Sequence, residues 1–165
     1  MIFFNTKYWP LVYFHLDNKK ITLDDFEEYK KTYLSILLKC KKEKNKIILI
    51  SDLNESNIDF EFVIKQAKFN YKIEKFNKLY VELVCIYLKN NNLKHILKMY
   101  FKICDSYCPY KICKSYNIIN DFIYEKTKKK YDTNLFSNLE YYIDNIDNND
   151  NIDNIEFKEF NENKI

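Results

Sequence analysis

The sequence contains no glycine and no arginine, and its 27 basic side chains are all lysines. Without glycine, the chain cannot form a phosphate-binding P-loop, a dinucleotide-binding turn or a nucleophile elbow of the usual kind, because each needs a backbone position free of Cβ. Without arginine it has no bidentate clamp for phosphate or guanine. Glycine, arginine and the scarce alanine share GC-rich codons, so this composition is typical of an AT-rich genome.

Long apolar runs are also missing, since none reaches the roughly 18–20 residues that cross a bilayer. The opening MIFFNTKYWPLVYFHL has no basic stretch before its apolar residues, and it is interrupted by Asn5, Lys7 and Pro10. It is therefore a poor signal peptide. We expect a cytoplasmic protein whose cysteines stay reduced.

Charge divides the chain into two parts. Residues 1–131 carry a net charge of +10 and residues 132–165 carry −7, within an overall +3. We expect a folded domain over 1–131, followed by an acidic, Asn-rich tail over 132–165 that is partly disordered or loosely docked. The aromatic content of 18% fits base stacking. We nevertheless predict no nucleic-acid partner, because the chain has neither arginine nor an RNA-binding motif.

The acidic residues of the tail recur at every third position from Asp144 to Glu162. An EF-hand calcium loop needs oxygen ligands at alternate positions and a central glycine, so this spacing does not form one. A disordered repeat tract is the favoured interpretation. Weak cation capture and an intramolecular cover for surface lysines are the alternatives.

Alternating strand and helix patterns run through residues 1–131. The segment WPLVYFHL is β-branched, aromatic and apolar on both faces, which predicts a buried parallel strand. Strands separated by helices of about a dozen residues form βαβ crossovers. We therefore predict an α/β fold with a single, mostly parallel β-sheet of four to five strands and helices packed on it, in βαβαβαβα order. The predicted strands are 9–16, 45–56, 79–88 and 109–116, with 2–4 as a short edge strand, and the predicted helices are 22–44, 59–78, 91–104 and 117–130.

Two of these helices have informative patterns. Thr22 is a good N-cap with Asp25 three residues later, close to a capping box. The helix over 59–78 carries two apolar stripes, one from Phe60 to Tyr71 and one from Phe62 to Phe76. A helix that is apolar on two sides should be covered on two sides.

Three of the five cysteines, Cys104, Cys108 and Cys113, lie within ten residues in the stretch CDSYCPYKIC. Structural zinc sites pair ligands two to four residues apart and bring a second pair from elsewhere. Buried packing is the favoured role for these cysteines. A redox-sensitive Cys108 and a metal site are the alternatives, and the spare ligands for a metal would be Cys40, Cys85, His15 and His95.

Catalysis has one candidate, Asp52, which comes at the end of a predicted strand, where open α/β sheets bind their ligands. A hydrolase-type D-x-D-x-[ST] motif is absent, since DLNES has Asn at the second acidic position. His15 and His95 are the histidines that could accompany Asp52 in an enzyme. We expect an ordinary turn role for Asp52, a hydrogen-bonded or surface role for each histidine, and no enzymatic activity.

The order of these segments resembles the divergent CRAL-TRIO domain over about residues 9–126. That family opens with a proline-led apolar strand, and an aromatic, Lys-rich helix leads into its central strand. Glycine and His-Pro positions of the family are missing here, where LKNNN follows the third strand. The STAS-like fold, a protein-binding module, is a close rival. The segments that carry the resemblance are WPLVYFHL, NKIILISDLNES, FVIKQAKFNYKIEKFNKLYVELVCIYLKN, NLKHILKMYFKIC and PYKICKSY.

The resemblance to CRAL-TRIO implies a pocket between sheet and helices for a lipid or another hydrophobic small molecule, or a docking surface for a protein partner. No cofactor or metal is expected. Three exposed lysines on the helix over 91–104 (Lys94, Lys98 and Lys102, the lysine ridge) would contact an anionic membrane surface peripherally. The predicted ligand-binding residues are Phe62, Phe69, Phe76, Leu97 and Phe101.

Overall fold

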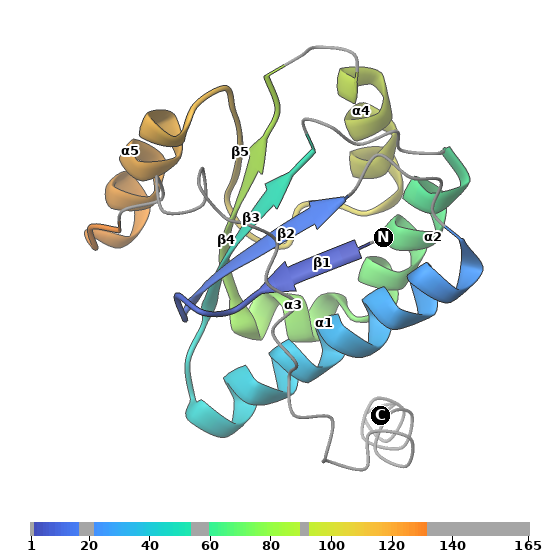
Figure 1. Cartoon of the computed structure of the whole chain (residues 1–165), viewed down its shortest axis with the longest axis horizontal. Helices are drawn as coiled ribbons and strands as arrows, with labels where there is room; N and C mark the ends of the chain where they lie inside the picture. Colours follow the sequence, from blue (N-terminus) through green and yellow to red (C-terminus); the bar gives the residue numbers. More distant parts are fainter. Residues whose placement is uncertain (1, 17–21, 54–59, 90–92, 132–165) are drawn as a thin grey trace.

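A computed structural model describes residues 2–16, 22–53, 60–89 and 93–131 of the chain (Figure 1). The turn predicted at 17–20 and the tail at 132–165 lie outside these residues. Five strands form one sheet in the sequential order β1-β2-β3-β4-β5, with β1 antiparallel to β2 and all other neighbours parallel. The predicted α/β fold with one mostly parallel sheet is confirmed. The strands are β1 (Ile2–Asn5), β2 (Leu11–Leu16), β3 (Ile47–Asp52), β4 (Val81–Tyr87) and β5 (Tyr110–Cys113).

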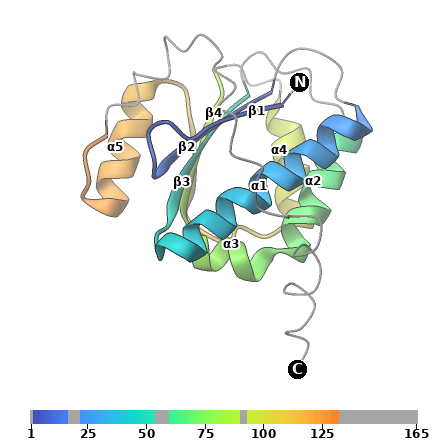
Figure 2. The same cartoon turned by 60° about the horizontal axis from the view of Figure 1, so that its bottom comes forward.

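The described helices divide unequally between the two faces of the sheet. Helices α1 to α4 cover one face and α5 packs on the other (Figure 2). The sequential strand order explains this arrangement, because crossovers of one hand that always move the chain in the same direction stay on one side. The helices are α1 (Leu23–Glu43), α2 (Phe60–Lys72), α3 (Glu74–Tyr80), α4 (Lys94–Ile103) and α5 (Tyr116–Thr127).

Helix α1 begins at the capping box that the sequence predicts. The backbone N–H of Asp25 donates to Thr22 Oγ1 at 3.2 Å, and the Thr22 backbone N–H donates to Asp25 Oδ2 at 2.8 Å. At the other end Lys44 adopts a left-handed conformation, and its N–H bonds the carbonyls of the last turn. Both ends therefore satisfy backbone groups that would otherwise lack partners.

The single helix predicted over 59–78 is wrong, because the chain breaks at Ile73 into α2 and α3. Ile73 has φ −103° and ψ 18°, outside the helical range, so the axis changes direction there. The redirected turn places Asn77, fully buried, beside α1 and α2. Residues 79 and 80 end α3, so β4 begins two residues later than predicted.

The prediction that α2 is covered on two sides holds along the middle of the helix. Phe62 and Phe69 pack edge-to-face on Tyr29 of α1, and α2 also packs along α4. At the two ends of the helix, Phe60 and Tyr71 are exposed, as many apolar side chains of folded proteins are.

Side chains of the strands alternate between two apolar layers, as the pleat requires. Val12 and Phe14 face α1 to α4, while Leu11 and Tyr13 face α5. Within the described ranges, no helix is long and apolar enough to span a membrane. All five cysteines are free thiols.

Candidate functional site

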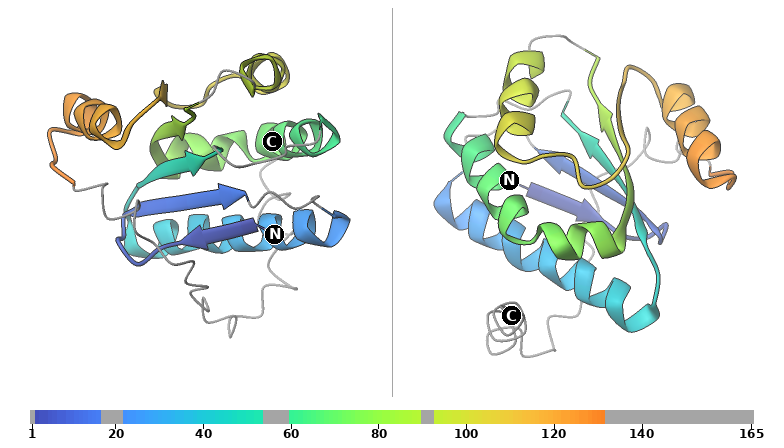
Figure 3. Two further views of the ribbon diagram at one scale, coloured as in Figure 1. Left: turned by 45° about the horizontal axis from the view of Figure 1, so that its top comes forward. Right: turned by 180° about the vertical axis from the view of Figure 1, so that it is seen from behind.

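An apolar pocket lies between the sheet and the helices α1, α2 and α4, and we call it the α4 pocket. Helices α2 and α4 lie side by side over this face of the sheet (Figure 3). The pocket has a volume of about 90 Å³. Its lining comprises Phe4, Phe14, Leu16, Tyr29, Tyr33, Leu49, Ser51, Leu53, Val63, Gln66, Asn70, Val84, Ile86, Leu93, Ile96, Leu97, Tyr100, Phe101, Asp105, Ser106, Tyr107, Cys108 and Tyr110.

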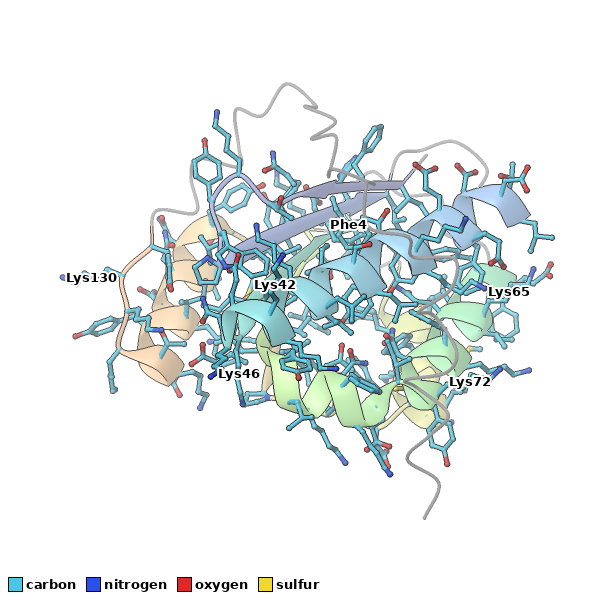
Figure 4. All side chains as sticks on the ribbon, turned by 90° about the horizontal axis from the view of Figure 1, so that it is seen from below. Phe4, Lys42, Lys46, Lys65, Lys72 and Lys130 are labelled. Atoms are coloured by element: carbon cyan, nitrogen blue, oxygen red, sulfur yellow. The ribbon has the colours of Figure 1, made fainter. Side chains whose placement is uncertain are left out.

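The sheet supplies the apolar floor of the pocket. Phe14 and Leu16 are alternate residues of β2, and Val84 and Ile86 are alternate residues of β4, so each pair faces the same side. Phe4, which Figure 4 labels, joins them from β1. Its ring lies 5.8 Å from that of Tyr29 on α1. The period-two pattern of the strands thus directs apolar side chains into the cavity.

Helix α4 forms the roof and has two chemically different sides. Leu93, just before the helix, and Ile96, Leu97, Tyr100 and Phe101 line the pocket at helical spacing, so one stripe of the helix is apolar. The lysine ridge follows at intervals of four residues, and its three side chains are exposed. An amphipathic helix therefore separates the cavity from a basic outer surface.

The wall contains polar side chains that are already hydrogen-bonded to one another. Gln66 Nε2 donates to the Tyr29 hydroxyl at 3.2 Å, and Asn70 Nδ2 donates to the Tyr100 hydroxyl at 2.7 Å. Buried polar groups cost free energy unless they are paired, so these bonds hold the side chains in fixed positions. The pocket is consequently apolar with a few oriented polar groups, as small-molecule sites generally are.

Behind this wall, Asn77 connects three helices. The Tyr33 hydroxyl of α1 donates to Asn77 Oδ1 at 3.0 Å, and Asn77 Nδ2 donates to Asn70 Oδ1 at 3.4 Å. These contacts fix α1, α2 and α3 around the inner end of the pocket.

Burial keeps the phenols of the pocket neutral. Burial raises the pKa of Tyr29 to about 12 and raises the pKa values of Tyr33, Tyr100 and Tyr107 well above their ordinary value. The charged form of each phenol is disfavoured because it would lose its hydration. At neutral pH these groups can therefore donate hydrogen bonds but carry no charge.

The loop between α4 and β5 closes the outer end of the pocket. The Ser106 hydroxyl donates to the Cys108 carbonyl, and the Tyr110 ring stacks on Phe101 at 4.2 Å. Burial raises the pKa of Cys104 to about 11 and that of Cys108 to about 12. Both thiols stay protonated at neutral pH, so neither is prepared as a nucleophile or a metal ligand.

Cys113, the third cysteine of this stretch, lies on the other face of the sheet. It is fully buried under α5 and touches Cys85 of β4. The hydrogen bond between the two thiols and burial raise the pKa of Cys85. The packing role predicted for these cysteines agrees with this position, since both lie in the second apolar layer. Among the described residues, no group of three His, Cys, Asp or Glu side chains could hold a metal ion.

The predicted ligand-binding residues occupy two different environments. Leu97 and Phe101 line the α4 pocket, whereas Phe62, Phe69 and Phe76 are not part of its lining. Phe62 and Phe69 make edge-to-face contacts with Tyr29, at 6.2 and 6.0 Å between ring centres. Phe76 is on α3 and packs against the core. These three rings therefore pack in the core next to the pocket and are not part of its lining.

Sequence reasoning did not identify the sheet residues and the tyrosines of the pocket. Tyr29 and Tyr33 are buried apolar residues of α1, and nothing next to them in the sequence marks them as pocket residues. Their hydroxyls become pocket and wall groups because α2 and α3 place amides opposite them. Nothing local in the sequence signals that pairing, since the partners are 37 and 44 residues away.

A second polar cluster lies on the α5 side of the sheet, at the carboxyl ends of β2 and β3. The parallel register pairs His15 with Asp52, and His15 Nδ1 lies 3.8 Å from Asp52 Oδ2. The Tyr13 hydroxyl donates to the same carboxylate oxygen, and the rings of Tyr13 and His15 stack at 6.4 Å. His95 is exposed on α4, on the opposite face, and the structure does not bring it to Asp52.

Comparison of the chain with models of protein families, with curated proteins and with solved structures found no match.

Proposed function

We propose that the chain is a non-catalytic binding protein that holds a hydrophobic small molecule, or one acyl segment of a lipid, in the α4 pocket. One observation carries the proposal: a cavity between sheet and helices whose walls are apolar side chains with a few oriented hydroxyl and amide groups. Cavities of this composition bind apolar ligands. The resemblance to CRAL-TRIO supports the same position for the ligand.

The size of the pocket limits the ligand. One water molecule needs roughly 10–15 Å³ of such space, so a pocket of about 90 Å³ has room for several water-sized groups. That is on the order of one aromatic ring or a short acyl segment. The proposal is therefore a compact ligand, and two full acyl chains exceed the space.

Two tryptophan substitutions on α4 test this proposal. Ile96 lines the pocket, whereas Ile103 is an exposed residue of the same helix outside the lining. Ile96→Trp should fill the cavity, and Ile103→Trp should leave it open.

Native mass spectrometry of the protein purified from cells should show a bound small molecule in the wild type and in Ile103→Trp, but not in Ile96→Trp. Circular dichroism checks that both variants are folded. If the wild type also carries no ligand, an apolar probe such as ethylbenzene should still bind, as measured by calorimetry. An empty wild type that does not bind this probe contradicts the proposal.

A protein-interaction module of the STAS-like type is the alternative function. It is favoured by β5, the last strand of the sheet, on which Tyr110 and Ile112 are 41% and 36% exposed. Apolar side chains on an edge strand are suited to docking another chain. In that case the wild type is empty and binds no apolar probe, and replacing both residues with serine abolishes partner capture in a pull-down.

We also propose a cytoplasmic location, with peripheral contact between the lysine ridge and anionic lipid headgroups. All three lysines are exposed on the outer side of the helix that roofs the pocket. Such an arrangement would place a hydrophobic ligand near the membrane from which it could be extracted. Each lysine near an anionic surface contributes about 1 kcal/mol to binding.

A further inference from the structure

The charges around the α4 pocket are unusual for a chain with 27 lysines. Among the described residues, none of the side chains that line the pocket is a lysine or a histidine. Among the described lining residues, the only charged one is Asp105, which is exposed in the loop between α4 and β5. The described lining therefore offers a ligand one carboxylate and no cation.

A carboxylate ligand would be poorly accommodated here. Transferring an ionised carboxylate from water into an apolar cavity is costly unless a cation or several donors compensate it. No described lining residue supplies a cation, and Asp105 repels the anion from the outer end. The lysine ridge points outward from the same helix and lies outside the lining.

One wall group is arranged for an uncharged ligand that accepts a hydrogen bond. The Tyr29 hydroxyl accepts an N–H from Gln66 Nε2 at 3.2 Å, and the Asn70 amide donates to the Tyr100 hydroxyl. The Gln66 amide is the donor in its contact with Tyr29, so the hydroxyl hydrogen of Tyr29 remains to be donated. Within the described ranges no protein acceptor receives it, and Tyr29 is buried in the lining.

We propose that the α4 pocket selects an uncharged apolar molecule with a hydrogen-bond acceptor, such as a carbonyl or ether oxygen, and rejects the corresponding carboxylate. This inference rests on the proposed function and adds the ligand class to it. Fatty acids and other apolar carboxylates are therefore excluded as preferred ligands. Neutral amides, ketones, esters and aldehydes of the same size are included.

A matched pair of compounds tests this selectivity. Phenylacetamide and phenylacetate have nearly the same shape, fit the size of the pocket and differ in charge. Calorimetric titration of the wild-type protein at pH 7.5 should show phenylacetamide binding at least about tenfold more tightly than phenylacetate, because only the carboxylate pays an uncompensated desolvation cost.

Three variants separate the contributions to this selectivity. Asp105→Asn should improve phenylacetate binding about twofold to threefold and leave phenylacetamide unchanged, since an exposed charge acts weakly. Asp121→Asn, on the exposed side of α5, is the matched control and should change neither affinity. Tyr29→Phe should weaken phenylacetamide about fivefold through the lost donor while leaving ethylbenzene, which has no acceptor, within twofold.

The outcomes of these titrations distinguish failure of the selectivity from failure of the proposed function. Phenylacetate binding as tightly as phenylacetamide to the wild type overturns the selectivity but leaves the proposed function intact. If ethylbenzene and both polar compounds fail to bind, the proposed function fails, and this inference fails with it. Should Tyr29→Phe be unfolded by circular dichroism, the comparison between Asp105→Asn and Asp121→Asn still decides the electrostatic part.

Discussion

At the level of single residues, the buried carboxylate of Asp52 on the α5 side of the sheet needs hydrogen-bond partners to offset its lost hydration. It is 8% exposed, and it faces the Tyr13 hydroxyl and the His15 ring. Burial and the nearby carboxylate raise the pKa of Tyr13, so its hydroxyl keeps the hydrogen that it donates. The hydrogen bond between Tyr13 and Asp52 lies between two buried side chains, so we propose that it stabilises the fold.

Tyr13→Phe should destabilise the fold by about 1.5–3 kcal/mol, because it removes a hydrogen bond to a buried charged group. Urea denaturation measures the free energy of unfolding. The control is Tyr124→Phe, whose side chain is 48% exposed and which should change stability by less than about 0.5 kcal/mol. Equal stabilities for the two variants would remove the structural role of this bond.

We predict that the folded protein loses stability at alkaline pH because of its buried thiols. Burial raises the pKa of Cys40 from 9.0 to about 12, so the folded state keeps its proton where the unfolded chain loses it. The stabilisation is complete below about pH 9 and is lost as the pH rises through the folded pKa, at up to about 1.4 kcal/mol per pH unit for each such thiol.

The measurement is urea denaturation of reduced protein between pH 8 and pH 11. Cys40→Ala should be less stable at pH 8 because of its cavity, and its stability should fall less steeply with pH than that of the wild type. Parallel curves for the two proteins would show that Cys40 does not hold its proton in the folded state.

At the level of elements, α1 depends on its N-terminal cap. Hydrogen bonds from the Thr22 backbone and side chain lower the pKa of Asp25. A lowered folded pKa stabilises the fold above the unfolded pKa, and this stabilisation is lost as the pH falls through the folded value. Thr22→Ala should therefore cost about 1 kcal/mol at pH 7.

The cost of Thr22→Ala should shrink below about pH 3, where Asp25 is protonated in both states. Thermal unfolding at pH 7 and pH 2.5 measures this change. Ser35→Ala, in the middle of the same helix, is the control and should be neutral or slightly stabilising because alanine favours helix. A constant cost of Thr22→Ala at both pH values would argue against the charged cap.

We predict that the lysine ridge of α4 binds anionic vesicles in a salt-dependent manner. Replacing the lysine ridge with glutamine should weaken flotation with phosphatidylserine-containing vesicles by on the order of a hundredfold at low salt, at about 1 kcal/mol per lysine. The same change at three exposed lysines of the α1 end (Lys41, Lys42 and Lys44) is the matched control and should have a smaller effect. Binding that is indifferent to salt and to anionic lipid would exclude this contact.

The elements that the sequence predicts well are those with local signals. The cap at Thr22 and the apolar run of β2 are decided within a few residues; the cap is where it was predicted, and the strand begins two residues later than predicted, at Leu11. The break at Ile73 was not predictable, because EKFNKLY continues a helical pattern without proline or glycine. Its cause is tertiary: Asn77 finds its partners on Tyr33 and Asn70.

At the level of the whole molecule, the alternation of strands and helices is enough to predict one mostly parallel sheet. The pocket is harder to predict, because it depends on which residues of distant elements leave space between them. Leu97 and Phe101, which were predicted to bind the ligand, line the pocket, whereas Phe62 and Phe69, which were predicted with them, pack on Tyr29 outside the lining. A helical stripe shows which side is buried but not whether the neighbouring element fills the space.

The position of the lysines separates the outer surface from the pocket. Lys65, Lys72 and Lys130 lie at the periphery of the fold (Figure 4). The described lining of the pocket has no lysine. The described part of the chain thus combines a lysine-rich surface with a pocket whose described lining has no cation, and our proposals for membrane contact and for ligand class depend on this separation.

The most direct test of the account is a nuclear magnetic resonance titration of the isotope-labelled full chain with phenylacetamide. We predict saturable chemical-shift changes at Val84, Leu97, Phe101 and Tyr107, which surround the α4 pocket. Resonances of Ile119 and Ile123, under α5 on the other face, should stay unchanged. Shifts centred on the α5 side, or no saturable shifts at all, would contradict the central claim that this cavity is a ligand site.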